Sequence, residues 1–146
     1  MKNPPTYEDA NLILKLYDMR RETRLRDARK FVGALPVLGT REDFLRLCPP
    51  GTEENASFRM VVTYWDMASS FLVTGIINKE LFFRANNLEL VFVWEKIKRA
   101  LPELRAASKN PTQYRHLEQI GDEFVAWMNE NAPDWYATFS AGLKKA

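Results

Sequence analysis

Cysteine, histidine and glycine are scarce in this chain. Its 146 residues include one cysteine, one histidine and six glycines. The single cysteine, Cys48, excludes an intramolecular disulfide, which fits a reducing compartment. The single histidine, His116, excludes metal sites that need several histidines, such as the Glu-x-x-His pairs of di-iron bundles. We therefore expect no metal and no cofactor.

Motifs of common catalytic and nucleotide-binding sites are also missing. Neither G-x-x-x-x-G-K-[ST] nor G-x-G-x-x-G occurs, so the usual glycine-rich phosphate loops are absent. The nucleophile-elbow motif G-x-S-x-G is absent as well. Cys48 precedes two prolines at a predicted helix end, where a small buried residue is more common than a nucleophile paired with His116. The sequence favours a non-enzymatic protein, with an enzyme of another type as the alternative.

No charge excess, long apolar run or leader sequence marks a partner or a compartment. The 21 basic and 19 acidic residues give a net charge of +2, which provides no clear nucleic-acid signal. The longest apolar region, residues 60–77, contains Asp66 and four Ser or Thr residues, too polar for a membrane span. The first residues lack the apolar region of a signal peptide. We expect a cytoplasmic protein without a membrane span.

Helix signals recur along the chain, and strand signals do not. No Asn-Gly or Asp-Gly turn joins alternating segments. The spacing of apolar residues predicts five longer helices and two short ones, packed as an irregular bundle around a central apolar helix. A hydrophobic share of 46% supplies enough material for one core. We predict an all-α fold with a single helical domain over residues 1–146.

Capping residues and prolines indicate where the predicted helices begin and end. Suitable N-cap residues are Thr6, Thr40, Thr52, Asn78, and Asn86 or Asn87. The pair Asn110-Pro111 and Pro133 mark two later starts, because proline fits the first turn of a helix. An apolar stripe continues in phase through Pro102, so we predict a kinked helix there, bent near Lys98.

The N-terminal helical region combines a long apolar stripe with arginines. The stripe keeps its phase from Ala10 to Val32, which predicts one long helix; two helices meeting near residues 20–23 are the alternative. Arg21 and Arg24 interrupt the stripe at positions where core residues are expected. We expect them to reach acidic residues on another helix or another chain.

A second apolar face on this region predicts self-association. Leu12, Leu16 and Met19 lie opposite the stripe that contains Ile13 and Tyr17. A terminal helix that is apolar on both sides is either sandwiched or covered by a partner. We expect a two-fold homodimer, the commonest oligomer. Its predicted interaction residues are Leu12, Leu16, Met19, Arg21 and Arg24.

The predicted central helix, residues 52–75, carries one narrow polar stripe. Its members fall within an arc of about 80° at 100° per residue, and they are Arg59, Thr63, Asp66, Ser70 and Thr74. The stripe either is the solvent-facing edge of a core helix or lines an internal ligand pocket anchored by Asp66. A buried Asp66 needs a basic partner, and Arg105 and His116 are the candidates.

Residues 15–30 form a basic segment, with seven Lys or Arg against three Asp or Glu. Arginines bind phosphate groups well, so an acidic nucleic-acid or lipid surface is a possible partner. The charges are spread around the helix and interleaved with acidic residues, as in a solvated helix with ion pairs. Binding through this segment is therefore the weaker alternative.

The middle half of the chain resembles uncharacterised helical bacterial proteins. The resemblance is carried by Tyr64-Trp65-Asp66, by Gly75-Ile76-Ile77-Asn78-Lys79-Glu80, and by the later Trp94 and Arg105. It implies an all-helical fold and brings no activity or catalytic residues with it. The leading functional hypothesis is a non-enzymatic protein-interaction module that self-associates. The alternative is a small-ligand pocket formed by Asp66, Thr63, Ser70, Arg105 and His116.

Overall fold

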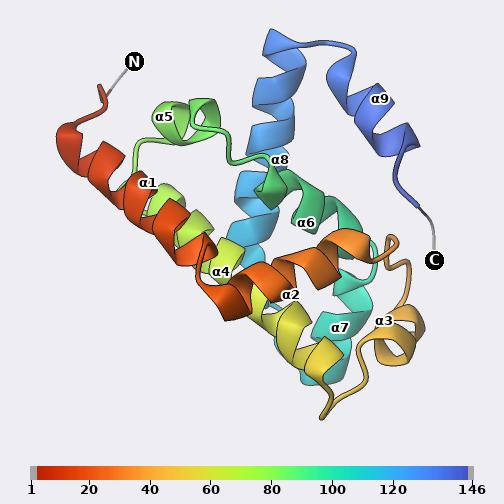
Figure 1. The fold of residues 1–146 in the computed structure, drawn as a ribbon. Coiled ribbons are helices and arrows are strands. Elements are labelled where there is room, and N and C mark those ends of the chain that lie inside the picture. The colour runs from red at the N-terminus through yellow and green to blue at the C-terminus, as the bar shows by residue number, and fades with distance from the viewer. Residues whose placement is uncertain (1–2, 145–146) are drawn as a thin grey trace.

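Helices make up the whole regular structure of the computed structural model, which describes residues 3–144 (Figure 1). Within these residues there are nine α-helices and no strand, which confirms the all-α prediction. The two residues at each end of the predicted domain lie outside the described residues. In chain order the helices are α1 (Tyr7–Arg20), α2 (Thr23–Ala34), α3 (Arg41–Leu47), α4 (Glu53–Val73), α5 (Lys79–Arg84), α6 (Glu89–Ile97), α7 (Leu101–Ser108), α8 (Arg115–Asn131) and α9 (Trp135–Ala141).

Helix α4 is the centre of the bundle, as predicted for residues 52–75. It packs against α2, α8 and α6 (Figure 1). Phe58, Val62 and Trp65 are among its fully buried side chains. A buried side chain of this size contributes about 1.5–3 kcal/mol, so α4 dominates the core. A helix with so much apolar surface needs neighbours on several sides, and the bundle supplies them.

The N-terminal region forms two helices, so the prediction of one long helix is wrong. Tight turn hydrogen bonds follow α1: the backbone N–H of Arg21 donates to the carbonyl of Asp18. The Glu22 carboxylate then caps α2 by accepting from the backbone N–H of Leu25 at 3.1 Å. This side-chain cap competes with the continuing helical ladder and starts a new helix axis.

The break between α1 and α2 changes which arginines face the core. Arg20 is buried, whereas Arg21 and Arg24 are exposed. The single-stripe interpretation assumed one helical phase across the junction, and the break ends that phase at Arg20. Arg21 and Arg24 therefore lie on the surface, although the stripe had placed them at core positions, and their contact with acidic residues of another helix or another chain stays a prediction.

Helices α6 and α7 are separated by a short turn at residues 98–100 instead of a kink. Pro102 lies in the first turn of α7, where it removes no required donor. The apolar stripe predicted through this region is correct, because all of its members are buried: Leu90, Trp94, Ile97, Leu101 and Leu104.

Three predicted starts are displaced towards the C-terminus. Helix α9 begins at Trp135, so Pro133 precedes the helix instead of standing in its first turn. Helix α8 begins at Arg115, because the Asn110 side chain instead closes a turn by accepting from the backbone N–H of Thr112 at 3.1 Å. Helix α6 has no side-chain cap, so the prediction of a cap at Asn86 or Asn87 is wrong. The Asn87 amide donates to the Phe82 carbonyl at 2.9 Å.

Candidate functional site

Asp66, the predicted ligand anchor, is half-buried and caps α8 from a neighbouring helix. Its Oδ1 accepts the backbone N–H of Leu117 at 2.9 Å. The N-cap residue of α8, Tyr114, provides no side-chain cap of its own. Orphan N–H groups at a helix start need an acceptor, and α4 supplies it here. This contact gives Asp66 a structural partner between the two most central helices.

The other members of the α4 polar stripe serve their own helix. The hydroxyl of Thr63 donates to the Arg59 carbonyl at 2.6 Å, and that of Ser70 donates to the Met67 carbonyl at 2.6 Å. Thr63 is exposed and Ser70 is half-buried. These contacts match the solvent-facing edge that was one of the two interpretations of the stripe.

The two predicted partners of Asp66 have different surroundings. The guanidinium of Arg105 forms an ion pair with Glu118 at 3.0 Å and donates from Nε to the Gln113 carbonyl at 2.9 Å. His116 is half-buried in the first turn of α8. None of the main cavities of the described chain is lined by Asp66, Arg105 or His116. Ligand binding by these residues stays a prediction.

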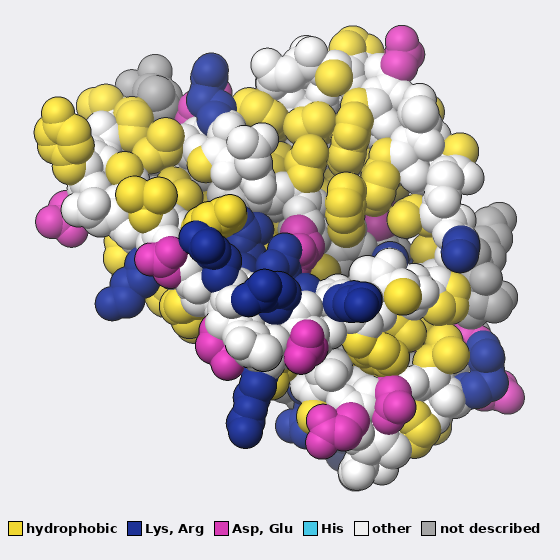
Figure 2. Space-filling view, viewed as in Figure 1, with side chains coloured by type: hydrophobic (Ala, Val, Ile, Leu, Met, Phe, Trp, Pro, Cys, Tyr) yellow, Lys and Arg dark blue, Asp and Glu magenta, His cyan; other side chains and the backbone are white. Residues whose placement is uncertain are grey.

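Helix α1 presents an apolar face to solvent. Tyr7 is 92% exposed, Leu14 is 62% exposed and Tyr17 is 50% exposed. Together with the half-buried Ala10 they follow one side of the helix at alternating intervals of three and four residues. We call these four residues the α1 face. Figure 2 shows hydrophobic side chains gathered at the left of the molecule, over this helix.

The α1 face is held rigid near its C-terminal end. The guanidinium of Arg20 lies 5.1 Å from the centre of the Tyr17 ring and 5.2 Å from that of Trp65. The Arg21 guanidinium lies 5.9 Å from the Tyr17 ring. These cation–π contacts fix the ring while leaving half of its surface in solvent.

The predicted interaction residues of α1 are divided between core and surface. Leu16 is buried and Leu12 packs against the core, while Met19 is 42% exposed. The buried side of α1 contains Ile13 and Leu16, one residue from each of the two apolar faces that the sequence predicted. The exposed apolar residues therefore lie mainly on the side of Leu14, which sequence periodicity had assigned to the core.

A basic side of α2 lies next to the junction with α1. Arg26, Arg29 and Lys30 share one side of this helix with Gly33, at the spacing of successive turns. Dark-blue side chains gather over α2 at the centre of Figure 2. Two arginines of the basic segment turn inward: Arg20 is buried and Arg29 is half-buried.

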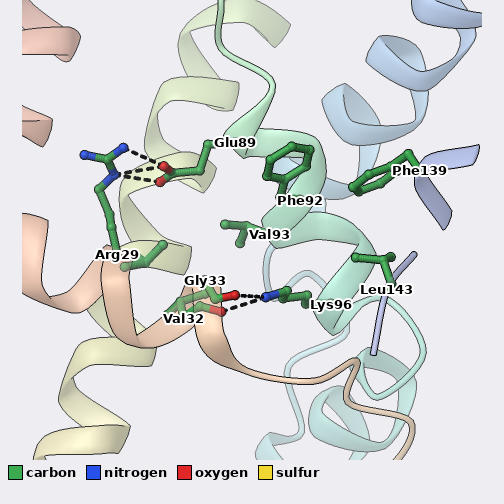
Figure 3. Close-up of a pocket in the computed structure, with 10 residues that line it drawn as sticks. Arg29, Val32, Gly33, Glu89, Phe92, Val93, Lys96, Phe139 and Leu143 are labelled. Atoms are coloured by element: carbon green, nitrogen blue, oxygen red, sulfur yellow. Dashed lines mark hydrogen bonds and ion pairs between the residues drawn. The ribbon is translucent and has the colours of Figure 1, made fainter. Parts of the chain in front are cut away.

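A cavity of about 250 Å³ lies between α2, α6 and α9 (Figure 3). Its apolar wall includes Val93 and Phe92 from α6 and Phe139 from α9. The rings of Phe92 and Phe139 are stacked at a centroid distance of 4.9 Å. Charged residues from α2 and α6 also line this space. We call this space the α2–α6–α9 cavity.

Three charged side chains line the α2–α6–α9 cavity. Arg29 and Glu89 form a two-pronged ion pair, with Nη2 at 2.7 Å and Nε at 2.9 Å from carboxylate oxygens. The indole N–H of Trp65 also donates to Glu89, at 3.0 Å. The ammonium of Lys96 donates to the carbonyls of Val32 and Gly33 at 3.0 and 2.7 Å, which caps the C-terminal end of α2 (Figure 3).

Cys48 is buried, in agreement with its predicted structural role. Burial raises the pKa of its thiol to about 11, with a smaller contribution from Glu54. A thiol with this pKa is a poor nucleophile near neutral pH, because the thiolate is the reactive form.

Among residues 3–144, no cluster of three or more His, Cys, Asp and Glu side chains is arranged to hold a metal ion. No helix of the same residues is long and apolar enough to cross a membrane.

Comparison with known proteins identifies one family. The family model described as "Domain of unknown function (DUF4760)" matches residues 5–124, from the approach to α1 into α8. This agrees with the resemblance to uncharacterised helical proteins. No curated protein and no solved structure is significantly similar to the chain.

Proposed function

The chain belongs to the DUF4760 family, and because the description of that family names no activity, we propose a function from the surface of α1. The proposal is a non-enzymatic protein-interaction module that pairs with a second copy of itself. The observation that carries it is the α1 face, on which Tyr7, Leu14 and Tyr17 are at least half exposed. Exposed apolar residues aligned along one helix are typical of interaction surfaces.

The spacing of the α1 face suits a partner helix. Intervals of three and four residues are those of a coiled-coil seam. In an antiparallel two-fold pair, Ala10 meets the partner's Leu14 and Tyr7 meets the partner's Tyr17. Each layer then combines side chains of compatible size, and the small Ala10 allows close approach. The same surface patch is used by both copies, as a two-fold interface requires.

The expected affinity is modest. Removing one large apolar side chain from water contributes about 1.5–3 kcal/mol. The α1 face offers three such side chains per copy, and association itself costs about 4–15 kcal/mol. We therefore expect dimers in the micromolar range of concentration. The fixed position of Tyr17 between Arg20 and Arg21 reduces the ordering cost on its part of the face.

Light scattering after size exclusion, repeated over a series of micromolar concentrations, tests the proposal. The chain has a mass of 17.0 kDa, and we expect the wild type to approach twice that value. Leu14→Arg places a charge in the middle of the seam and should yield the monomer. Met60→Arg is the matched control, because Met60 is an exposed apolar residue on α4.

Two results would contradict pairing through α1. The first is a monomeric mass for the wild type at every concentration tested. The second is an unchanged dimeric mass in Leu14→Arg, which would assign the dimer to another surface. Both variants replace exposed side chains, so far-ultraviolet circular dichroism should confirm that each retains the wild-type helix content.

Three other expectations from the sequence remain as weaker proposals: a ligand at Asp66, binding of an acidic surface and a cytoplasmic location. A ligand anchored at Asp66 would have to compete with Leu117 for the same carboxylate. Binding of an acidic surface would use the exposed cations Arg24, Arg26 and Lys30, and retention on heparin at low salt would support it. We also expect a cytoplasmic location, in keeping with the free thiol of Cys48.

A further inference from the structure

We propose that the α2–α6–α9 cavity binds a small organic anion with an apolar body, such as an aromatic or short-chain carboxylate. This site lies on different elements from the α1 face and from Asp66. The proposal is independent of self-association. It rests on the charge of the cavity wall, on free donor capacity at that wall, and on the size and apolar character of the remaining space.

The charged wall has an excess of positive charge. Arg29 and Lys96 contribute two cations, and Glu89 contributes one carboxylate. That carboxylate already accepts from Arg29 and from the Trp65 indole. It therefore offers little to a cationic ligand. The imbalance favours a ligand that brings one negative charge.

Lys96 is the residue best placed to receive that charge. Its side chain is only 9% exposed, yet it carries an ammonium group. Two of the three ammonium donors go to the carbonyls of Val32 and Gly33, which leaves one for a ligand within the described part of the chain. Burial lowers the pKa of Lys96, and the nearby Lys144 adds to this effect. A bound carboxylate would offset the cost of keeping the ammonium charged.

Arg29 supplies a second set of donors on the same wall. Its Nη1 donates to the Arg20 carbonyl at 3.2 Å, and its Nε and Nη2 contact Glu89. A guanidinium has five N–H donors, so the terminal nitrogens retain capacity for a ligand oxygen. The contact with Glu89 also holds the guanidinium plane in place, which spares a ligand the cost of ordering it.

The remaining walls define the size and character of the ligand. A volume of 250 Å³ equals the share of roughly eight liquid waters, at about 30 Å³ each. A single ring or a short acyl chain fits this space. Phe92, Phe139 and Leu143 offer an apolar lining to the ligand body (Figure 3). Apolar lining with a few convergent polar groups is the usual make-up of small-molecule sites.

Further cations lie close to the cavity on α2. Arg26 and Lys30 lie on the same side of α2 as Arg29 and Gly33, one turn away from the lining residues. Their charges raise the local concentration of anions and lower that of cations. In this proposal, part of the basic segment, residues 15–30, attracts anions to the cavity.

A titration with matched probes tests the proposal. Benzoate and hexanoate are added to the ¹⁵N-labelled full chain up to millimolar concentrations, in parallel with benzyl alcohol and 1-hexanol. We expect the carboxylates to shift amide signals of α2, α6 and α9, and to bind about tenfold or more tightly than the alcohols. Absence of any shift with both carboxylates would overturn the proposal, and equal affinity of the alcohols would overturn its anionic part.

Two variants locate the ligand. Gly33 lines the cavity, and a Cβ at this position meets no atom within 4 Å, so Gly33→Leu can extend into the cavity without displacing the core. It should abolish binding, whereas Gly33→Ala, the control, should retain most of it. Lys96→Met removes the ammonium and should weaken binding about tenfold or more.

Loss of the Lys96 contacts to α2 could unfold the Lys96→Met variant, and the Gly33 pair then decides the question alone. Both Gly33 variants replace a helical glycine with a better helix former, so their folding is not at risk. Unchanged carboxylate binding in Gly33→Leu would place the ligand elsewhere and overturn the proposal.

Discussion

The contact between Gly121 on α8 and Trp94 on α6 predicts an unusual outcome for a glycine-to-alanine change in a helix. A Cβ at Gly121 would lie 2.6 Å from Cγ of the Trp94 indole and closer still to its Cδ1. Carbon atoms in contact are normally about 3.5–4.0 Å apart, so the ring would have to retreat by roughly 1 Å. Trp94 is only 4% exposed, and its indole N–H donates to Asp122 at 2.9 Å. A retreat therefore disturbs both core packing and this hydrogen bond.

The magnitude of the effect of Gly121→Ala follows from three contributions to the free energy of unfolding. Alanine is better than glycine in a helix interior by about 1 kcal/mol. Overpacking a core costs about 1–3 kcal/mol. Weakening a hydrogen bond to a carboxylate costs up to about 1.5–3 kcal/mol more. We expect Gly121→Ala to lower the free energy of unfolding by about 1–5 kcal/mol, although alanine is the better helix former.

Urea unfolding, followed by circular dichroism and tryptophan fluorescence, measures this change. Gly33→Ala is the matched control, because a Cβ at Gly33 in α2 meets no atom within 4 Å; it should stabilise the protein by up to about 1 kcal/mol. In a Trp94→Ala background the clash is gone, so Gly121→Ala should there become neutral or stabilising. A Gly121→Ala variant as stable as the wild type would refute the reasoning.

Two further predictions concern carboxylates that cap helices. Asp66→Ala should lower the free energy of unfolding by about 1–2 kcal/mol, because the backbone N–H of Leu117 loses its acceptor. Asp66→Asn keeps an acceptor oxygen and should retain most of the wild-type stability. An unchanged melting temperature in Asp66→Ala would disprove this capping role. Hydrogen bonds from Thr6 and Asn78 lower the pKa of Asp9 in the folded state. The contribution of Asp9 to the stability of the fold is therefore complete above its unfolded-state pKa, about 3.9. This contribution is lost as the pH falls through the lower folded-state pKa. The stability difference between wild type and Asp9→Asn should therefore shrink below pH ~4, and a difference independent of pH would count against it.

Local signals in the sequence were sufficient for most helices. Thr6 and Thr40 each begin a helix with a complete capping box, in which the threonine hydroxyl is paired with the carboxylate of an aspartate three residues later. The predicted core helix was recognisable because its apolar residues surround all but a narrow stripe. These features depend on residues within one or two turns of each other, and a single sequence contains them in full.

The break between α1 and α2 depends on tertiary contacts that periodicity does not contain. An apolar stripe that keeps its phase is compatible with one helix or with two. Burial of Arg20 against Trp65 stabilises the end of α1, and Trp65 lies on α4. Only the packed structure brings these two residues together, so the sequence around Arg20 does not indicate that Trp65 is its partner.

The α2–α6–α9 cavity was missed for a related reason. Arg29 and Lys96 are far apart in the chain and meet only through the packing of α2 against α6. One local sign was present: α6 is apolar from Leu90 to Trp94, and Glu95 and Lys96 follow within the same buried stretch. Charged residues in an otherwise apolar helix need partners when buried, and that requirement could have directed attention to Lys96.

The extent of the family match divides the α2–α6–α9 cavity into two parts. Arg29, Glu89 and Lys96 lie within the matched residues 5–124, whereas Phe139 and Leu143 follow them. Helix α9 buries none of its side chains fully. It is held by ring stacking, with Phe139 between Phe92 and Trp135, and by a hydrogen bond from the Lys98 ammonium to the Tyr136 hydroxyl. Elements with few buried contacts open at low cost in free energy. If the cavity binds an anion, residues of the matched part of the chain therefore determine the preference for negative charge. Helix α9 and the residues after it determine the size of the ligand and its access to the cavity.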